Sequence, residues 1–492
     1  MKNITNKYLC FLFAAATLVV SCEDLEVENL NQPDAQRALS SDSDIISLID
    51  GSVTDTFSNL INLPSAYFDF MADQISTTNA YLDFWGFADQ PRRAINNSTT
   101  NSNLYPVSSP WGAYNQSIYN ANVVLRLVNV DERTISDDGT DVTAAKKATA
   151  LFVRGISLGT IGMIYDKGYR VDENTDLGAL EFEDYSALIG YALADIGASI
   201  DAAPSDFEFQ IYDGYTIDRA TFVKVANSFR AKIAMGVKRG GAGDETINYA
   251  QVISWLDAGI TEDFDPPASN GVLYNNGQDW MTYTLSDDSG YMPVDQKIAF
   301  LVQGDESVQP KDYPTDASVI LGPITNTTDS RIANYFAYTT NFGYLRESRG
   351  RHLFSNYRHT RFFTGNNRNQ DGLSTNIFSK AEANYLKAEA QLLNGDTAGA
   401  LATINASAER AASGLPAATN AAAALLYEYS IELHLNGTIG TNHFFMRRHN
   451  LLQAGTPLHY PVPAGELEIS GLDPYTFGGP GGDAAASGPG WK

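Results

Sequence analysis

The sequence predicts a mainly α-helical protein built from helical hairpins of the tetratricopeptide type, and residues 379–412 show the pattern most clearly. Ser379 and Glu382 have capping-box spacing, in which the serine hydroxyl accepts from a first-turn amide and the glutamate bonds back to the cap amide. Gly395 supplies a left-handed helix stop, and Asp396 is placed to cap a second helix. Each helix has one apolar stripe, so the pair needs stacked neighbours, as repeats of about 34 residues provide.

Apolar residues recur at helical spacing in several other segments. In chain order, we expect helices over 44–63 with a break near Gly51, from Pro110 and Trp111 onward, and over 144–165, 182–203, 221–240 with Asp218 as cap, 249–260 and 421–436. The segment 144–165 is apolar almost all round, which predicts a buried helix. It can form a hairpin with the helix before it across the polar loop 131–141.

The helical signal fades in two places. Residues 67–105 read mainly as loop, while Gly, Pro, Asn, Asp and aromatic residues dominate 263–375, with strand-like pieces such as 297–303. A long insertion of this kind in a compact body is usually functional. We therefore predict one helical domain over 44–470 with a loop-rich insertion at 263–375, followed by a mobile Gly/Pro-rich tail at 471–492.

The N-terminus predicts a lipoprotein. Lys2 and Lys7 precede a short apolar run that ends in Leu-Val-Val-Ser-Cys22, which resembles a bacterial lipobox. We expect residues 1–21 to be a signal peptide, Cys22 to be acylated and 22–43 to be a tether, with a plain secretory signal as the alternative. The acidic residues after Cys22 resemble a signal for the outer face of the outer membrane.

Charge narrows the class of partner. The 492 residues carry a formal charge of −25, which becomes −27 when the signal peptide leaves with its two lysines and no acid. This acidity argues against nucleic acid or an anionic lipid surface as the main partner. The two cysteines fall in the signal peptide and at the lipidation position, so no disulfide is expected in the mature chain.

Several landmarks resemble the SusD/RagB family of outer-membrane nutrient-binding (glycan-binding) lipoproteins. Besides the lipobox, they are Trp111-Gly-Ala-Tyr to Ala-Asn122, Phe152-Val-Arg-Gly, Asp329-Ser-Arg-Ile332, Glu382-Ala-Asn-Tyr-Leu-Lys-Ala-Glu389 and Pro461-Val-Pro-Ala-Gly-Glu466. Residues 406–414 and 431–448 match the family loosely, so the chain resembles a divergent member. The resemblance implies a solenoid-like body of four hairpins with ligand loops on one face, sitting on a SusC-like TonB-dependent transporter.

Two aromatic loops are candidate ligand sites, because sugar rings present apolar C–H faces and a rim of hydroxyls. The candidate contacts are Tyr81, Asp83 and Trp85 in the first loop, and Asn276, Asp279, Trp280, Tyr283 and Tyr291 in the second. Local packing under a long loop is the alternative for each. Trp111 and Trp255 lie on helices with apolar stripes, so we expect both in the core.

Two further sequence patterns bear on ligand or metal binding. Six arginines and two histidines from Arg346 to Arg368 indicate either recognition of an anionic ligand or internal pairing with the chain's excess acid. Residues 172–183 have part of the EF-hand spacing but lack glycine at the sixth position, so no metal is predicted there. No P-loop or other cofactor motif stands out, and no cofactor is expected.

The expected function is therefore non-enzymatic capture of an oligosaccharide at the cell surface and its delivery to the transporter. Three alternatives stay open: the same scaffold binding peptide or another nutrient, a glycoside hydrolase using a carboxylate pair, and a helical scaffold with no small ligand.

Overall fold

The computed structural model describes residues 39, 41–240, 246–266, 292–303, 322–351, 353–361, 377–488 and 490. The chain divides into two compact units, Met1–Asp44 and Ile45–Lys492. In the described part of the first unit, Ser41 Oγ accepts from the Asp44 amide at 3.1 Å, where the helix α3 (Asp42–Leu60) begins. The second unit holds all the other elements described below.

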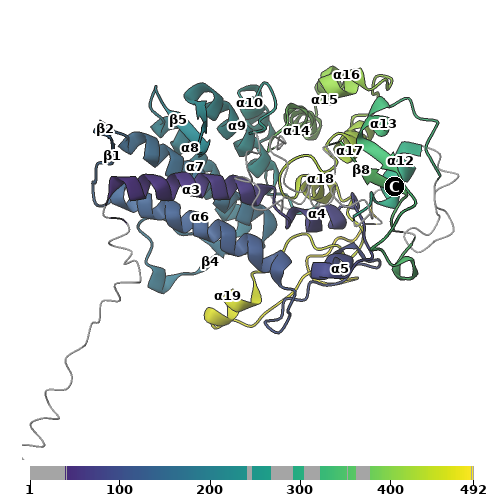
Figure 1. Ribbon diagram of the computed structural model, residues 1–492, viewed down its shortest axis with the longest axis horizontal. Coiled ribbons are helices and arrows are strands. Elements are labelled where there is room, and N and C mark those ends of the chain that lie inside the picture. Colours follow the sequence, from purple (N-terminus) through teal and green to yellow (C-terminus); the bar gives the residue numbers. More distant parts are fainter. Residues whose placement is uncertain are drawn as a thin grey trace, which may run out of the picture. The chain divides into compact units, whose positions relative to one another are not determined.

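A succession of packed helices forms most of the second unit (Figure 1). In packing order, these helices are α6 (Tyr105–Asn129), α7 (Thr143–Ile164), α8 (Tyr185–Ala202), α9 (Arg219–Met235), α10 (Tyr249–Asp257), α14 (Lys380–Leu393), α15 (Thr397–Ala406) and α17 (Ala421–Ile431). The helix α3 runs alongside α6, where Thr56 Oγ1 donates to Ser117 Oγ at 3.1 Å. The prediction of a mainly α-helical protein built from hairpins is confirmed.

Shorter elements connect and flank these helices. The helical ones are α4 (Ser65–Met71), η1 (Tyr81–Asp83), α5 (Phe84–Ala88), η2 (Leu177–Ala179), α12 (Gln296–Gln303), α13 (Ser330–Tyr335), η5 (Glu347–Arg349), α16 (Ala408–Ala412), α18 (Thr441–Arg448) and α19 (Ala464–Ile469). The antiparallel hairpins are β1 (Ser136–Asp137) with β2 (Thr140–Asp141), β3 (Lys167–Tyr169) with β4 (Phe182–Asp184), β5 (Glu208–Tyr212) with β6 (Tyr215–Asp218), and β7 (Phe336–Tyr338) with β8 (Tyr357–His359).

The helix α7 is the centre of the hairpin array. Every residue from Ala148 to Ile164 is buried, as the all-round apolar pattern predicts. Within the described residues, α7 is also the one helix long and apolar enough to cross a membrane, but its side chains pack inside the unit. It pairs with α6 across the loop 131–141, where β1 and β2 form a small hairpin.

Most predicted helix caps are confirmed. Ser379 Oγ accepts from the Glu382 amide at 3.0 Å, Asp396 caps α15 through the Gly399 amide, and Asp218 caps α9. The second half of the capping box is wrong, because the Glu382 carboxylate pairs with the buried Lys232 ammonium at 2.5 Å instead. A buried ammonium needs a carboxylate more than a neutral backbone amide does, because leaving a charge unpaired costs more than leaving an amide unpaired.

Some predicted boundaries are wrong for local physical reasons. The helix α3 runs through Gly51 because Ile49 and Val53 on either side of it are buried, which offsets the roughly 1 kcal/mol cost of glycine. The helix α6 begins at Tyr105 and includes Pro110 near its start. Residues 297–303 are helical rather than a strand, because the Asp295 carboxylate caps α12 by accepting from the Lys297 amide at 2.9 Å.

The loop regions contain more order than expected. In the segment 67–105, α4 and α5 are short helices, with every α4 residue buried. The Gly/Pro-rich tail is packed rather than mobile: the Phe477 carbonyl accepts from the Ile95 amide at 2.9 Å, and Gly455 donates to the Ala486 carbonyl at 2.8 Å. The tail therefore closes over loops that lie near the start and end of the unit's sequence.

The insertion leaves and rejoins the helical array at one point. Phe264 and Phe378 exchange backbone hydrogen bonds of 2.9 and 3.1 Å, so α10 can pack directly on α14. In Figure 1 the insertion's α12, α13 and β8 lie at the end of the unit opposite the β1–β2 hairpin. The insertion thus interrupts the sequence of the array without interrupting its packing.

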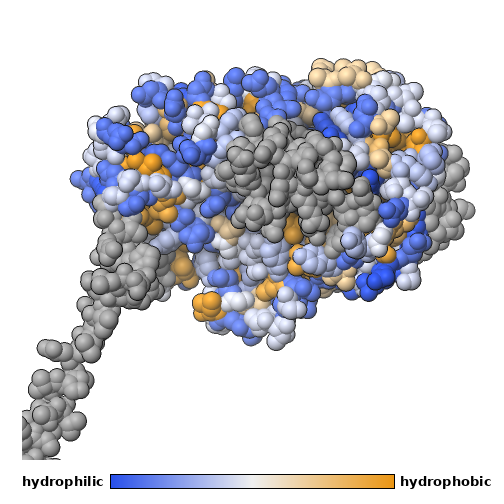
Figure 2. All heavy atoms as spheres, viewed as in Figure 1, coloured by the Kyte–Doolittle hydropathy of each residue, from blue (hydrophilic) through white to orange (hydrophobic). Residues whose placement is uncertain are grey.

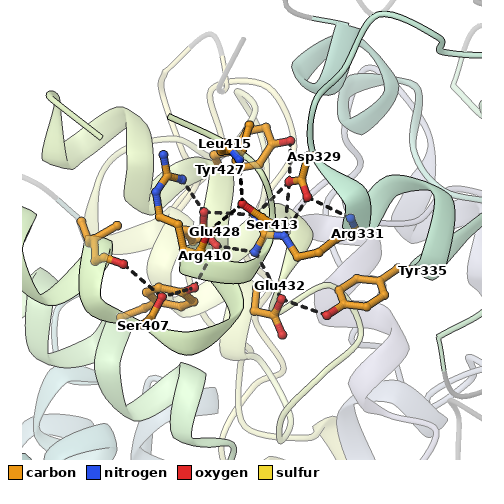
Figure 3. Close-up of polar contacts among 12 residues, drawn as sticks. Asp329, Arg331, Tyr335, Ser407, Arg410, Ser413, Leu415, Tyr427, Glu428 and Glu432 are labelled. Carbon is orange, nitrogen blue, oxygen red and sulfur yellow. Dashed lines mark hydrogen bonds and ion pairs between the residues drawn. The ribbon is translucent and has the colours of Figure 1, made fainter. Parts of the chain in front are cut away.

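A buried ionic network fastens the insertion to the array (Figure 3). Arg331 on α13 donates to Glu428 on α17 at 2.6 Å and to Asp329 at 2.8 Å. Three carboxylates face three guanidinium groups, so the network is charge-balanced; its other members are Glu432, Arg361 and Arg410. Buried charges need pairing of this kind, because each one alone would cost several kcal/mol.

We predict that Glu428→Gln destabilises the protein by about 3–5 kcal/mol, because it leaves Arg331 and Arg410 buried with too few negative partners. Urea denaturation measures the free energy of unfolding. Glu208→Gln, on the exposed edge of β5, is the matched control and should cost less than about 0.5 kcal/mol. Equal losses in the two variants would contradict the role given to the network.

A second prediction concerns acid stability. Burial tends to raise the pKa of Glu389, but Arg448 at 2.7 Å and His449 outweigh it and lower this pKa to about 2. The folded state therefore favours the charged carboxylate, so its contribution to stability is present above pH 4.5 and is lost as the pH falls toward 2.

Glu389→Gln should therefore flatten the fall in unfolding free energy over this pH window. Urea titrations of both proteins at a series of pH values measure the slope. Parallel curves for the variant and the unmodified protein would contradict the assignment.

Candidate functional site

The structure describes one of the two predicted aromatic loops. Tyr81, Asp83 and Trp85 lie in described residues at η1 and α5. The second group lies outside the described residues; its members are Asn276, Asp279, Trp280, Tyr283 and Tyr291. The lipidation candidate Cys22 also lies outside them. The candidate site therefore consists of the first loop and of the residues that the fold places beside it.

The turn before α5 holds Tyr81 outward. Leu82 and Asp83 both adopt left-handed backbone angles, with φ of +48° and +63°. Such angles in residues with side chains cost about 1–2 kcal/mol each and are commonest at functional positions. The Tyr81 side chain is 51% exposed, while the next aromatic residue, Phe84, is buried beneath it.

A second exposed tyrosine, Tyr344, belongs to the insertion and lies beside this turn. Asn79 joins the two segments, because its Oδ1 accepts from the Tyr81 amide at 2.8 Å and its Nδ2 donates to the Tyr344 carbonyl at 3.2 Å. Thr78 adds a bond from the Arg346 amide at 2.6 Å. Tyr344 is 56% exposed and lies 265 residues from Asn79 in sequence. Asn79 thus brings the backbones of the two exposed tyrosines together.

Trp85 lies between arginines from the same two segments. The guanidinium carbons of Arg93 and Arg349 are 4.6 and 4.8 Å from the centroid of its ring. Arg349 also donates to the Thr78 carbonyl at 3.3 Å. The half-buried indole therefore acts as a support for two cations, and the exposed stacking surface is tyrosine. We call Tyr81, Trp85, Arg93, Tyr344 and Arg349 the tyrosine face.

A polar pocket of about 230 Å³ adjoins this face and shares Arg93 with it. Its polar lining comes from Asp83, Arg92, Arg93, Asn96, Asn101 and Asn103, and its apolar lining includes Phe87, Leu104 and Val107. Asn101 donates to the Asn96 carbonyl at 2.8 Å and accepts from the Asn103 backbone amide at 3.0 Å, whereas the side-chain amide groups of Asn96 and Asn103 bond to no other described residue. We call this hollow the amide pocket.

Asp83 connects the two parts of the site. Its carboxyl group lines the amide pocket, and partial burial raises its pKa even though Arg93 acts to lower it. A carboxyl group in this position can accept hydrogen bonds when ionised and donate one when protonated, which suits a hydroxyl-rich ligand.

Buried charges hold the walls of the amide pocket. Asp73 binds Arg92 at 2.5 Å and Lys297 at 2.8 Å, and Arg92 also donates to the carbonyls of Phe87 and Phe70. The ends of α4 and α5 are thereby fixed to α12. Sequence reasoning missed Arg92 and Arg93, although two arginines after Pro91 in so acidic a chain are a signal.

The arginines of the later cluster have two kinds of environment. Arg361 pairs with Glu432 at 2.8 Å, and Arg351 binds the Phe354 carbonyl and Asn356, so these two are internal. Arg346 and Arg349 are exposed and form no ion pair with other described residues. His352 and Arg368 lie outside the described residues.

The structure also tests the two tryptophans expected in the core and the EF-hand-like segment. Trp111 is buried as expected, but Trp255 is partly exposed, with Arg230 at 4.4 Å from its ring, and lines a pocket of about 730 Å³ between α8 and α10. In the EF-hand-like segment, Asp172 Oδ1 accepts from Asn174 and Thr175. The described part of the chain contains no cluster of three metal-binding side chains.

Comparison with known proteins shows that the chain shares its fold with solved structures. No protein-family model and no curated protein matches the chain. Among solved structures, it is similar to a SusD superfamily protein from Bacteroides thetaiotaomicron, with 12% identity, a TM-score of 0.56, and coverage of 84% of this chain and 89% of that one.

Two further structures are similar over a comparable length. A surface glycan-binding protein A from Bacteroides uniformis has 15% identity and a TM-score of 0.56, over 87% of this chain and 98% of that one. A laminarin-binding SusD-like protein has 15% identity and a TM-score of 0.51, over 88% and 94%. The predicted architecture is therefore confirmed: this chain has the SusD-like fold.

Proposed function

We propose that this protein binds oligosaccharides and does not transform them. The observation that carries the proposal is the pairing of two exposed tyrosines with an adjoining pocket lined by amides, on a fold shared with proteins described as glycan-binding. Among the residues coloured by hydropathy in Figure 2, hydrophilic ones outnumber hydrophobic ones, which is compatible with a protein that works in water.

The two parts of the site suit the two kinds of surface on a sugar. Tyr81 and Tyr344 offer flat rings to the apolar C–H faces, while the amide pocket offers donors and acceptors to the hydroxyl groups. Exposed contacts of this type give affinities in the micromolar to millimolar range, which permits release after capture.

Catalysis fits the site less well. A glycoside hydrolase needs two carboxyl groups on opposite sides of the scissile bond. Among the described residues that line the amide pocket, Asp83 is the one carboxyl group. The alternatives of a peptide or another nutrient as ligand use the same face and are distinguished by the binding experiment below.

Location and delivery complete the proposal. The lipobox-like sequence ending at Cys22 supports a lipid anchor in the outer membrane, with the acidic residues after it directing the protein to the cell surface. A SusC-like TonB-dependent transporter would then receive the captured oligosaccharide. These steps rest on the sequence resemblance rather than on the site.

We predict that Tyr81→Ala and Tyr344→Ala each weaken oligosaccharide binding about tenfold, because each removes a stacking surface worth about 1 kcal/mol or more. Isothermal titration calorimetry of the purified chain against a panel of oligosaccharides measures the Kd.

Tyr119→Ala is the matched control, because Tyr119 is 53% exposed and lies on α6 beside a different pocket. Binding of peptides but of no saccharide would contradict the proposal. Equal effects of all three substitutions on saccharide binding would contradict the placement of the site.

A further inference from the structure

The arginines of the tyrosine face are unusual in their charge environment. The chain has 58 acidic and 33 basic residues, yet Arg346 and Arg349 lie exposed on one turn without a carboxylate partner among the described residues. Arg93 pairs with Asp89, but its side chain is still 51% exposed. Cations left exposed in so acidic a protein point to a partner that supplies negative charge from outside.

The local acids do not neutralise these cations. Glu347 is exposed and lies 4.0 Å from Arg351, on the inner side of the same turn. The Asp89–Arg93 pair is a surface pair, which contributes little and leaves other guanidinium donors available. Asp83, the acid inside the amide pocket, is partly buried.

Trp85 holds two of the guanidinium groups in place. Bringing Arg93 and Arg349 to one ring costs electrostatic repulsion, and the negative face of the ring offsets part of that cost. A guanidinium stacked on an aromatic ring keeps its N–H edge free for planar, bidentate bonds to a carboxylate or a sulfate.

We infer that the ligand of this site is an anionic oligosaccharide, whose carboxylate or sulfate groups bind the guanidinium groups of Arg93 and Arg349. The inference rests on the proposed function, because it names the class of saccharide taken at the same site. Arg93 also lines the amide pocket, so one arginine can bind the acidic group of a sugar whose hydroxyls face Asn96 and Asn103. Arg346, on the same turn as Arg349, adds attraction at longer range.

The test compares three probes on the purified chain: an oligogalacturonate carrying carboxylates, a carrageenan oligosaccharide carrying sulfate esters, and a neutral laminari-oligosaccharide. We expect one of the anionic probes to bind at least about tenfold more tightly than the neutral one, and its affinity to fall as salt is raised. Which anionic probe binds identifies the acidic group.

Substitutions of the arginines test whether these side chains bind the anionic probe. Arg349→Gln and Arg93→Gln should each weaken binding of the anionic probe about tenfold, a larger factor than the one by which they weaken binding of a neutral saccharide. Arg349→Lys keeps the charge but not the planar fork, so it should retain part of the affinity. Arg170→Gln is the matched control, because Arg170 is also an exposed arginine stacked 4.0 Å from an aromatic ring, that of Tyr191, beside an acid, Asp172.

The outcomes separate the two proposals. If neutral and anionic saccharides bind equally and the arginine variants change neither, the anionic specificity is wrong and saccharide binding stands. If Arg170→Gln weakens binding as much as Arg349→Gln, the arginines of the tyrosine face have no specific role. If no saccharide binds, the proposed function itself fails.

Discussion

The buried ionic network around Glu428 is the constraint on which the site depends. Arg331, Arg361 and the β7–β8 hairpin belong to the insertion, whereas Glu428 and Glu432 belong to the helical array. The segment that carries Tyr344 and Arg349 lies between β7 and β8, so the ionic network that holds this hairpin also sets the position of the segment. The network thus fixes the described part of the insertion as one wall of the site.

The other half of the site is held by a smaller buried cluster. Asp73, Arg92 and Lys297 join the ends of α4 and α5 to α12. This support can stabilise the left-handed Leu82 and Asp83, which on their own disfavour the turn that exposes Tyr81. Both walls of the site therefore rest on buried ion pairs beneath their surface loops.

Local sequence signals predicted the helices because caps and apolar stripes act over a few residues. Ser379, Asp396 and Asp218 cap the helices that their spacing indicated. The predictions failed where residues distant in sequence determine the local structure. Glu382 pairs with Lys232, 150 residues away, and Gly51 stays helical because its neighbours are buried in the core. The site is the extreme case, since nothing near Trp85 in sequence indicates Arg349 or Tyr344, and only the anchored insertion brings them together.

The proposed ligand site lies where the loops 78–104 and 344–351 meet. Hydrogen–deuterium exchange of the chain with and without a saturating oligosaccharide tests it most directly, because it locates binding without altering a side chain. The account predicts slower exchange in both segments together. Protection confined to α8 and α10, around the larger pocket, would contradict it.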